Sequence, residues 1–163
     1  WLMGPVESVQ AYTATRLANI EVEDVGLAIL RFRSGALGVA EATTTARPRD
    51  LEGSVSVLGE HGSVVIGGFA VNRVDTWNFS EASPDDERPD EWSQNPPTVY
   101  GFGHMAFYSD VLECIREKRR AMLDGLEGRK SLELVIAIYQ ASATKHEVRL
   151  RYVPEGVPLG VGY

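Results

Sequence analysis

The chain has 163 residues, of which 44% are hydrophobic, so it can bury a core, and its length favours one domain while allowing two small ones. The formal net charge of −7 argues against nucleic acid as the main partner. No run is apolar enough to cross a bilayer, and residues 1–16 lack a signal-peptide pattern. The single cysteine, Cys114, excludes an internal disulfide and fits a reducing compartment, which suggests a cytoplasmic location.

Residues 1–5, Trp-Leu-Met-Gly-Pro, have the pattern of the last turn of a helix. Gly4 would be its left-handed terminator, and Pro5 would block continuation. A helix whose body is missing suggests that the chain begins inside a larger protein. A loosely alternating segment from Val6 to about Arg16 then predicts a first strand.

Two hairpins are predicted next. The first joins β-rich segments at residues 25–32 and 36–45 through Arg33-Ser34-Gly35, in which Gly35 supplies the left-handed residue of the turn. The second joins residues 53–58 and 63–66 through the turn at residues 59–62. Both patterns indicate antiparallel pairing.

A further strand is predicted at residues 69–79, with Val71, Val74 and Trp77 facing inward. Residues 80–100 then carry six acidic residues against one arginine, together with four prolines, which is the composition of an exposed loop or a partly disordered insertion. This segment is either a solvated spacer or a lid or subunit-contact arm, because Trp92 and Tyr100 are costly to leave in water.

Two helices and a strand complete the pattern. Helical spacing of Phe107, Val111 and Cys114 predicts an amphipathic helix at residues 105–116, on which Cys114 reads as a small apolar group rather than a reactive thiol. Asp124 and Glu127 form a capping-box variant, so the second helix begins near Gly125, and its apolar residues on most faces predict burial. Alternation at residues 148–153 predicts the last strand.

Basic residues cluster around the end of the first helix: Arg116, Lys118, Arg119 and Arg120. Cations at a helix C-terminus complement the macrodipole, which explains the cluster without a phosphate site.

The order of these elements predicts an α+β fold with an open, predominantly antiparallel β-sheet and two helices on one face. We expect a single domain over residues 1–153, with the acidic segment 80–100 as a loop and residues 154–163 as a tail. If the other face of the sheet is apolar, another subunit or domain must cover it.

Few residues suggest chemistry. There is no dinucleotide-binding fingerprint, and no two histidines have metal-ligand spacing, so we expect no metal site. His61 and His146 read as surface residues. His104 follows a glycine-flanked approach to a helix, with Tyr108 one turn later, so it either contacts a ligand or merely caps the helix or packs. Arg47, in a loop with Arg49, either binds an anionic substrate or is solvated.

A family resemblance emerges from four segments: residues 23–38, residues 58–64, His104-x-x-x-Tyr108 and the string from Asp124 to Val135. Together they resemble the C-terminal domain of the Gfo/Idh/MocA family, over residues 1 to about 153. This family comprises NAD(P)-dependent sugar, inositol and nucleotide-sugar oxidoreductases. The resemblance implies the dihydrodipicolinate-reductase-like C-terminal fold of these enzymes and a sugar-like substrate.

The resemblance also implies what this chain lacks. The family has an N-terminal Rossmann domain with the cofactor and a catalytic lysine, and its catalytic histidine lies on a helix ending in a segment similar to residues 1–5. Both would precede Trp1, so we expect no catalytic residue and no NAD or NADP binding in this chain, which would be inactive alone. By position in the family, His104, Tyr108 and Arg47 line the substrate cleft.

The open sheet face, which follows from helices on one side only, predicts a homodimer or homotetramer assembled through that face. The alternative from another functional class is a non-catalytic binding or scaffold domain that assembles through the same face. A Rossmann fingerprint encoded upstream of Trp1 would favour the enzyme.

Overall fold

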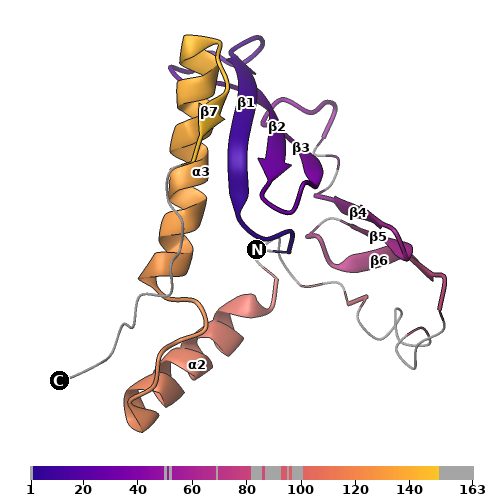
Figure 1. Ribbon diagram of the computed structural model, residues 1–163, viewed down its shortest axis with the longest axis vertical. Helices are drawn as coiled ribbons and strands as arrows, with labels where there is room; N and C mark the ends of the chain where they lie inside the picture. Colours follow the sequence, from indigo (N-terminus) through magenta and orange to yellow (C-terminus); the bar gives the residue numbers. More distant parts are fainter. Residues whose placement is uncertain are drawn as a thin grey trace. The chain divides into compact units, whose positions relative to one another are not determined.

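The computed structural model describes residues 2–49, 51, 53–68, 70–81, 86, 93, 94, 96 and 101–150 (Figure 1). Trp1, Trp92, Tyr100, the tail at 154–163 and the predicted strand beyond Leu150 lie outside the described residues. The chain divides into two compact units. The first unit comprises Trp1–Ala46 with Arg120–Tyr163, and the second comprises Arg47–Arg119. That residues 1–153 act as one domain stays a prediction.

The first unit contains a four-stranded antiparallel sheet and one helix. Its strands lie in the order β3-β2-β1-β7, and its elements are β1 (Val6–Ala14), β2 (Val25–Phe32), β3 (Leu37–Thr43), α3 (Gly125–Thr144) and β7 (Val148–Arg149). The predicted first strand and first hairpin are confirmed. Gly35 has φ of 91° in the turn, a conformation that glycine adopts without steric cost.

The core of the first unit lies between the sheet and α3, which runs alongside β1 (Figure 1). Small residues on α3 let the helix backbone approach the sheet closely, and Ser142 of α3 accepts a hydrogen bond from the Thr13 backbone at 3.0 Å. The buried apolar residues come from β1, β2 and α3: Val9, Ala11, Ala28, Leu30, Phe32, Ala137 and Ala141. The core is therefore built on one face of the sheet.

Helix α3 begins at Gly125, as predicted. The Asp124 carboxylate caps it by accepting hydrogen bonds from the amides of Leu126 at 2.9 Å and Glu127 at 3.1 Å. The Arg120 guanidinium, together with these amides, lowers the pKa of Asp124 to about 2. In a complete capping box, the Glu127 carboxylate would accept a hydrogen bond from the Asp124 backbone amide. Here the Glu127 carboxylate pairs with Lys130 instead.

The outer side of α3 is exposed, so the prediction that this helix is buried is wrong for the described chain. Leu132 is 60% exposed, and three further large side chains on the same side are also exposed: Val135, Ile136 and Tyr139. These apolar side chains led the sequence pattern to predict burial. In this chain, however, the sheet covers only the opposite side of the helix.

The face of the sheet away from α3 is open in the described chain, as the sequence predicts, and it is largely apolar. Alternation along β2 buries Ala28, Leu30 and Phe32 and leaves the intervening side chains exposed. We define the open face by its residues on three strands: Gln10 and Tyr12 of β1, Leu27, Ile29 and Arg31 of β2, and Leu37, Val39 and Glu41 of β3. At its centre Ile29 is 58% exposed and Val39 is 76% exposed.

The connection between β1 and β2 is held by Asp24, which is 2% exposed. Its carboxylate accepts hydrogen bonds from the backbone amides of Arg16 at 2.9 Å, Leu17 at 2.7 Å and Ala18 at 2.9 Å. The amides of Ala18 and Leu17, and then that of Arg16, hold the pKa of Asp24 below its usual range. Sequence reasoning missed this residue, because its partners are backbone groups.

Replacing Asp24 with alanine should lower the Tm of the chain by about 5–10 °C, because three amides lose a buried acceptor. Since the folded-state pKa is depressed, the carboxylate adds stability above its unfolded-state pKa, and that stability is lost as pH falls through the folded-state value. Thermal unfolding by circular dichroism, measured from neutral to acidic pH, checks both points. Glu21→Ala, at an exposed position of the same connection, is the matched control. Equal Tm values for the two variants would contradict the anchoring role.

The second unit contains a three-stranded antiparallel sheet in the order β4-β5-β6 and the helix α2. The elements are β4 (Val55–Gly59), β5 (Gly62–Gly67), β6 (Arg73–Phe79) and α2 (Gly103–Glu117). The second hairpin and the amphipathic helix are thus confirmed. Gly62 is required in this sheet, because a Cβ atom there would lie 2.4 Å from the Phe79 ring and 2.5 Å from the Asn78 carbonyl oxygen.

Strand β6 begins at Arg73 rather than at residue 69. Val71 lies before it in a turn, with φ of 53° and an exposed side chain, so the prediction that Val71 faces inward is wrong. Described residues of the acidic segment contact this strand. Trp77 donates its indole N–H to the Asp86 carboxylate at 2.8 Å, and the Val74 amide donates to the Ser93 hydroxyl at 3.0 Å.

The predicted class, α+β with open antiparallel sheet structure and two helices, is confirmed. The strands are divided over two sheets, where the sequence suggested one. Hairpins can be recognised locally, but which hairpins join in one sheet depends on contacts between residues distant in the chain.

Candidate functional site

The first two turns of α2 carry the predicted site residues His104 and Tyr108. Both side chains are exposed, Tyr108 by 59%, and their spacing places them one turn apart on one side of the helix. The ring of Phe107 packs beside that of Tyr108, with centroids 5.7 Å apart and planes tilted by 59°. Met105, which is also exposed, extends this apolar surface.

Among the described residues, the cap position of α2 provides no side-chain cap. Phe102 occupies the cap position without a side-chain hydrogen bond, and the first turn carries no acidic residue. Amides of a first helical turn that lack such a cap can donate to a ligand oxygen. The imidazole of His104 can donate or accept a hydrogen bond, and the Tyr108 phenol can do the same. Aromatic faces beside hydrogen-bonding groups suit a polyhydroxylated ligand.

Arg47 lies in the loop before β4, in the same unit as α2, and its side chain is exposed. The structure therefore brings His104 and Tyr108 together on one helix and leaves Arg47 on a separate loop. That the three line one substrate cleft stays a prediction. The predictions that His61 and His146 are surface residues are confirmed, since both are exposed.

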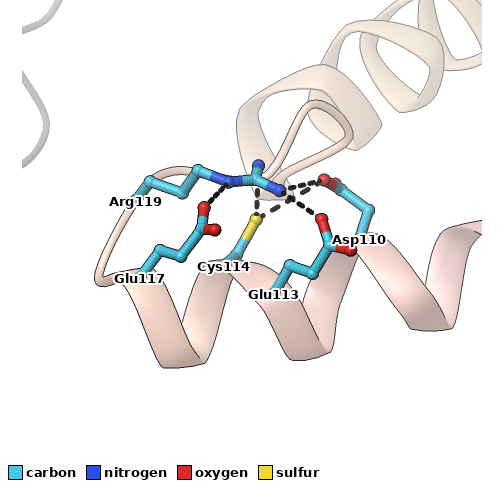
Figure 2. Close-up of polar contacts among 5 residues, drawn as sticks. All are labelled: Asp110, Glu113, Cys114, Glu117 and Arg119. Atoms are coloured by element: carbon cyan, nitrogen blue, oxygen red, sulfur yellow. Dashed lines mark hydrogen bonds and ion pairs between the residues drawn. The ribbon is translucent and has the colours of Figure 1, made fainter.

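The end of α2 holds a polar cluster that sequence reasoning did not find (Figure 2). Arg119 turns back along the helix and donates to three carboxylates, those of Glu117 at 2.8 Å, Asp110 at 2.9 Å and Glu113 at 3.2 Å. These bonds, that to Glu117 first, raise the pKa of Arg119 above its ordinary value. The spacing of Asp110, Glu113 and Glu117 on one side of the helix was the available signal.

Cys114 lies inside this cluster and is 7% exposed. Its sulfur atom is 3.0 Å from an Arg119 nitrogen and 3.7 Å from an Asp110 oxygen (Figure 2). Burial raises the pKa of the thiol above its ordinary value, although the Arg119 charge acts in the opposite direction. The interpretation of Cys114 as a packed side chain rather than a nucleophile therefore agrees with its surroundings.

The described residues contain no βαβ unit of the kind that binds a dinucleotide. All their strand pairings are antiparallel, whereas a dinucleotide cradle needs a parallel βαβ unit with a glycine-rich turn. Within the same residues, no three His, Cys, Asp or Glu side chains gather closely enough to hold a metal ion. Over the part of the chain that the structure describes, no helix is long and apolar enough to cross a membrane.

Two solved structures are similar to nearly the whole chain. WlbA dehydrogenase from Bordetella pertussis, in complex with NADH and UDP-GlcNAcA, is 46% identical over 94% of this chain, with a TM-score of 0.87. WlbA from Chromobacterium violaceum, in complex with the same two molecules, is 48% identical over 92% of this chain, with a TM-score of 0.84. This chain spans only 44% and 41% of the lengths of those two chains.

More distant structures share the fold. Levoglucosan dehydrogenase, in complex with NADH and levoglucosan, is 19% identical over 93% of this chain and 47% of its own, with a TM-score of 0.70. None of the curated proteins matches the chain. The family model described as "Oxidoreductase family, C-terminal alpha/beta domain" matches residues 1–150, so the chain belongs to the Gfo/Idh/MocA oxidoreductase family as its C-terminal domain.

Proposed function

We propose that this chain is the substrate-binding and assembly part of an NAD-dependent dehydrogenase that acts on a nucleotide-sugar, with UDP-GlcNAcA as the first substrate to test. The observation that carries the proposal is the identity of 46% and 48% with two dehydrogenases whose solved structures contain NADH and UDP-GlcNAcA. That identity extends over more than nine-tenths of this chain.

In this proposal the nicotinamide supplies the hydride chemistry and is bound outside this chain. The chain's own residues bind and orient the sugar. His104 and Tyr108 exchange hydrogen bonds with hydroxyl groups, and the Arg47 guanidinium pairs with an anionic group of the substrate, either phosphate or carboxylate. The protein acts in the cytoplasm, where the single thiol of this chain stays reduced.

The partner of the open face in this proposal is another copy of the chain, in a homodimer or homotetramer. Five large apolar side chains lie exposed together on this face: Tyr12, Leu27, Ile29, Leu37 and Val39. A contiguous apolar surface of this size is unusual on a monomer, and a flat sheet face can pack on a copy of itself about a two-fold axis.

Turnover by the full-length protein tests the catalytic proposal. With UDP-GlcNAcA and NAD⁺, the full-length protein should produce NADH, followed by its absorbance, and a nucleotide-sugar two hydrogen atoms lighter by mass spectrometry. UDP-GlcNAc, which lacks the carboxylate, is the matched control substrate and should react at least about tenfold more slowly, because one charge-assisted contact is missing.

The 163-residue chain alone should be inactive and should give no binding signal with NADH in titration calorimetry. Measurable NADH affinity of the chain alone would contradict our placement of the cofactor. Absence of turnover with UDP-GlcNAcA, with NAD⁺ or NADP⁺, would contradict the proposed substrate. Should the full-length protein also fail to bind either dinucleotide, the scaffold alternative would replace the enzyme.

A further inference from the structure

Strand β6 lies at the end of the sheet β4-β5-β6, so only one of its two edges pairs with another described strand. Backbone amides and carbonyls on the free edge of such a strand can pair with a strand of a second molecule. Proteins commonly cover or interrupt these edges, because an uncovered edge leads to association. The free edge of β6 therefore needs a cover.

Two neighbouring residues of the acidic segment (residues 80–100) contact the first part of β6 and the turn before it. The Val74 backbone amide donates to the Ser93 hydroxyl at 3.0 Å. In the turn, the Asn72 side-chain amide donates to the Gln94 carbonyl oxygen at 2.9 Å, while the Asn72 side-chain oxygen accepts from the Ala70 amide at 3.2 Å. Because a hydroxyl takes the place of a backbone carbonyl, the Val74 amide is satisfied without a further strand.

A third contact lies farther along β6. The Trp77 indole N–H donates to the Asp86 carboxylate at 2.8 Å, and a hydrogen bond to an ionised acceptor is stronger than one between neutral groups. The Trp77 ring also packs edge-on against the Phe79 ring, with centroids 5.1 Å apart and planes at 64°. Trp77 therefore anchors the acidic segment to a ring that is itself packed on the strand.

The three contacts follow β6 in the reverse of chain order. Gln94 bonds to residue 72, Ser93 to residue 74 and Asp86 to residue 77. This direction is that of an antiparallel strand, but each contact uses a side chain on at least one partner, where a strand would use its backbone ladder. The acidic segment also carries six acidic residues against one arginine, so a second copy that approached this edge would meet like charge.

We infer that the acidic segment is a strap on the free edge of β6, and that it prevents a strand of a second molecule from pairing there. We call it the edge strap and define it by its contacts at Asp86, Ser93 and Gln94. A solvated spacer would need none of these contacts. A subunit-contact arm would join molecules, whereas the edge strap keeps them apart at β6. The edge strap acts whether or not the protein binds a nucleotide-sugar.

Hydrogen exchange in the full-length protein tests whether the contacts act together. Asp86→Ala removes the contact with Trp77 and leaves the Val74 amide and the Ser93 hydroxyl in place. Release at Asp86 should still speed exchange of the Val74 amide by at least about fivefold, measured by mass spectrometry with single-residue fragmentation. Glu81→Ala, at an exposed position of the same segment, is the matched control and should leave this rate unchanged. Unchanged exchange at Val74 in Asp86→Ala would show that the contacts are independent, and it would overturn the edge strap.

Sedimentation velocity of the full-length protein tests the protective role. The double variant D86A/S93A loses two of these contacts and should form species larger than the parent at micromolar concentrations, because the free edge of β6 can then pair with a second molecule. The control E81A/S54A removes the same two chemical groups at exposed positions and should sediment like the parent. Circular dichroism should show parent-like folding for both double variants.

Val74→Pro in the D86A/S93A background separates strand pairing from other causes of association. Proline has no amide hydrogen and is tolerated on an edge strand, and the Val74 amide donates to Ser93 rather than to β5. The larger species should therefore disappear. If they persist, or if D86A/S93A sediments like its control, the edge strap does not block strand pairing and the proposed role is wrong.

Discussion

Ile29→Glu should convert the associated chain into a monomer. Ile29 occupies the centre of the open face, so the substitution removes buried apolar area and places an unpaired carboxylate between two sheets. The combined cost corresponds to a rise in dimer Kd of at least about 1,000-fold. Light scattering across micromolar concentrations, with circular dichroism to confirm folding, measures the outcome.

Leu132→Glu provides the matched control for this substitution. Leu132 is as exposed as Ile29, but it lies on α3, on the other side of the sheet. The same change in charge and apolarity there should leave the mass of the associated chain unchanged. If Leu132→Glu dissociates the chain and Ile29→Glu does not, the outer side of α3 is the assembly surface and the open face is not.

The elements that the sequence predicts correctly are those with local physical causes. A carboxylate before a helix satisfies first-turn amides, so Asp124 marked the start of α3. A glycine that can adopt positive φ marked the turn at Gly35. A β-rich run of residues marked the strand β2, whose side chains alternate between the core and the exposed face in the structure.

The remaining features depend on contacts that no local pattern encodes. Val71 has a strand-like neighbourhood in sequence, yet the backbone turns there and β6 begins at Arg73. The apolar side chains on the outer side of α3 predicted burial, but burial needs a covering element, and the described residues of the first unit leave that side of the helix exposed. Asp24 was missed because its partners are backbone amides. The Arg119 cluster was missed because Arg119 reaches the carboxylates only when the chain turns back at the end of α2.

The candidate site shows the same division. Helical spacing was enough to place His104 and Tyr108 on one side of α2, and the structure confirms that placement. The assignment of Arg47 to the substrate cleft came from family resemblance. Arg47 lies in a loop, outside the helices and strands of the second unit. A role of the three residues in one cleft depends on the substrate and on the rest of the enzyme, so it is a question for kinetics.

In the full-length enzyme, His104→Ala should lower kcat/KM by about 10–100-fold, the effect of losing one strong hydrogen bond to the substrate. Because the side chain is exposed in the first turn of α2, the Tm should change by less than about 2 °C. Steady-state kinetics and thermal unfolding on the same preparation separate the two effects. Tyr108→Phe keeps the ring and removes only the hydroxyl, so it should lower kcat/KM less than His104→Ala does.

His61→Ala is the matched control for this prediction. His61 is also an exposed histidine of the second unit, but it lies in the β4–β5 turn rather than on α2. It should leave both kcat/KM and Tm unchanged. If His104→Ala lowers Tm and kcat/KM in parallel, His104 serves the fold of α2, and the substrate contact must come from elsewhere. If it lowers kcat/KM alone while His61→Ala does neither, the exposed imidazole on α2 contributes to substrate recognition, and the surface formed with Tyr108 and Phe107 is the part of this chain that faces the sugar.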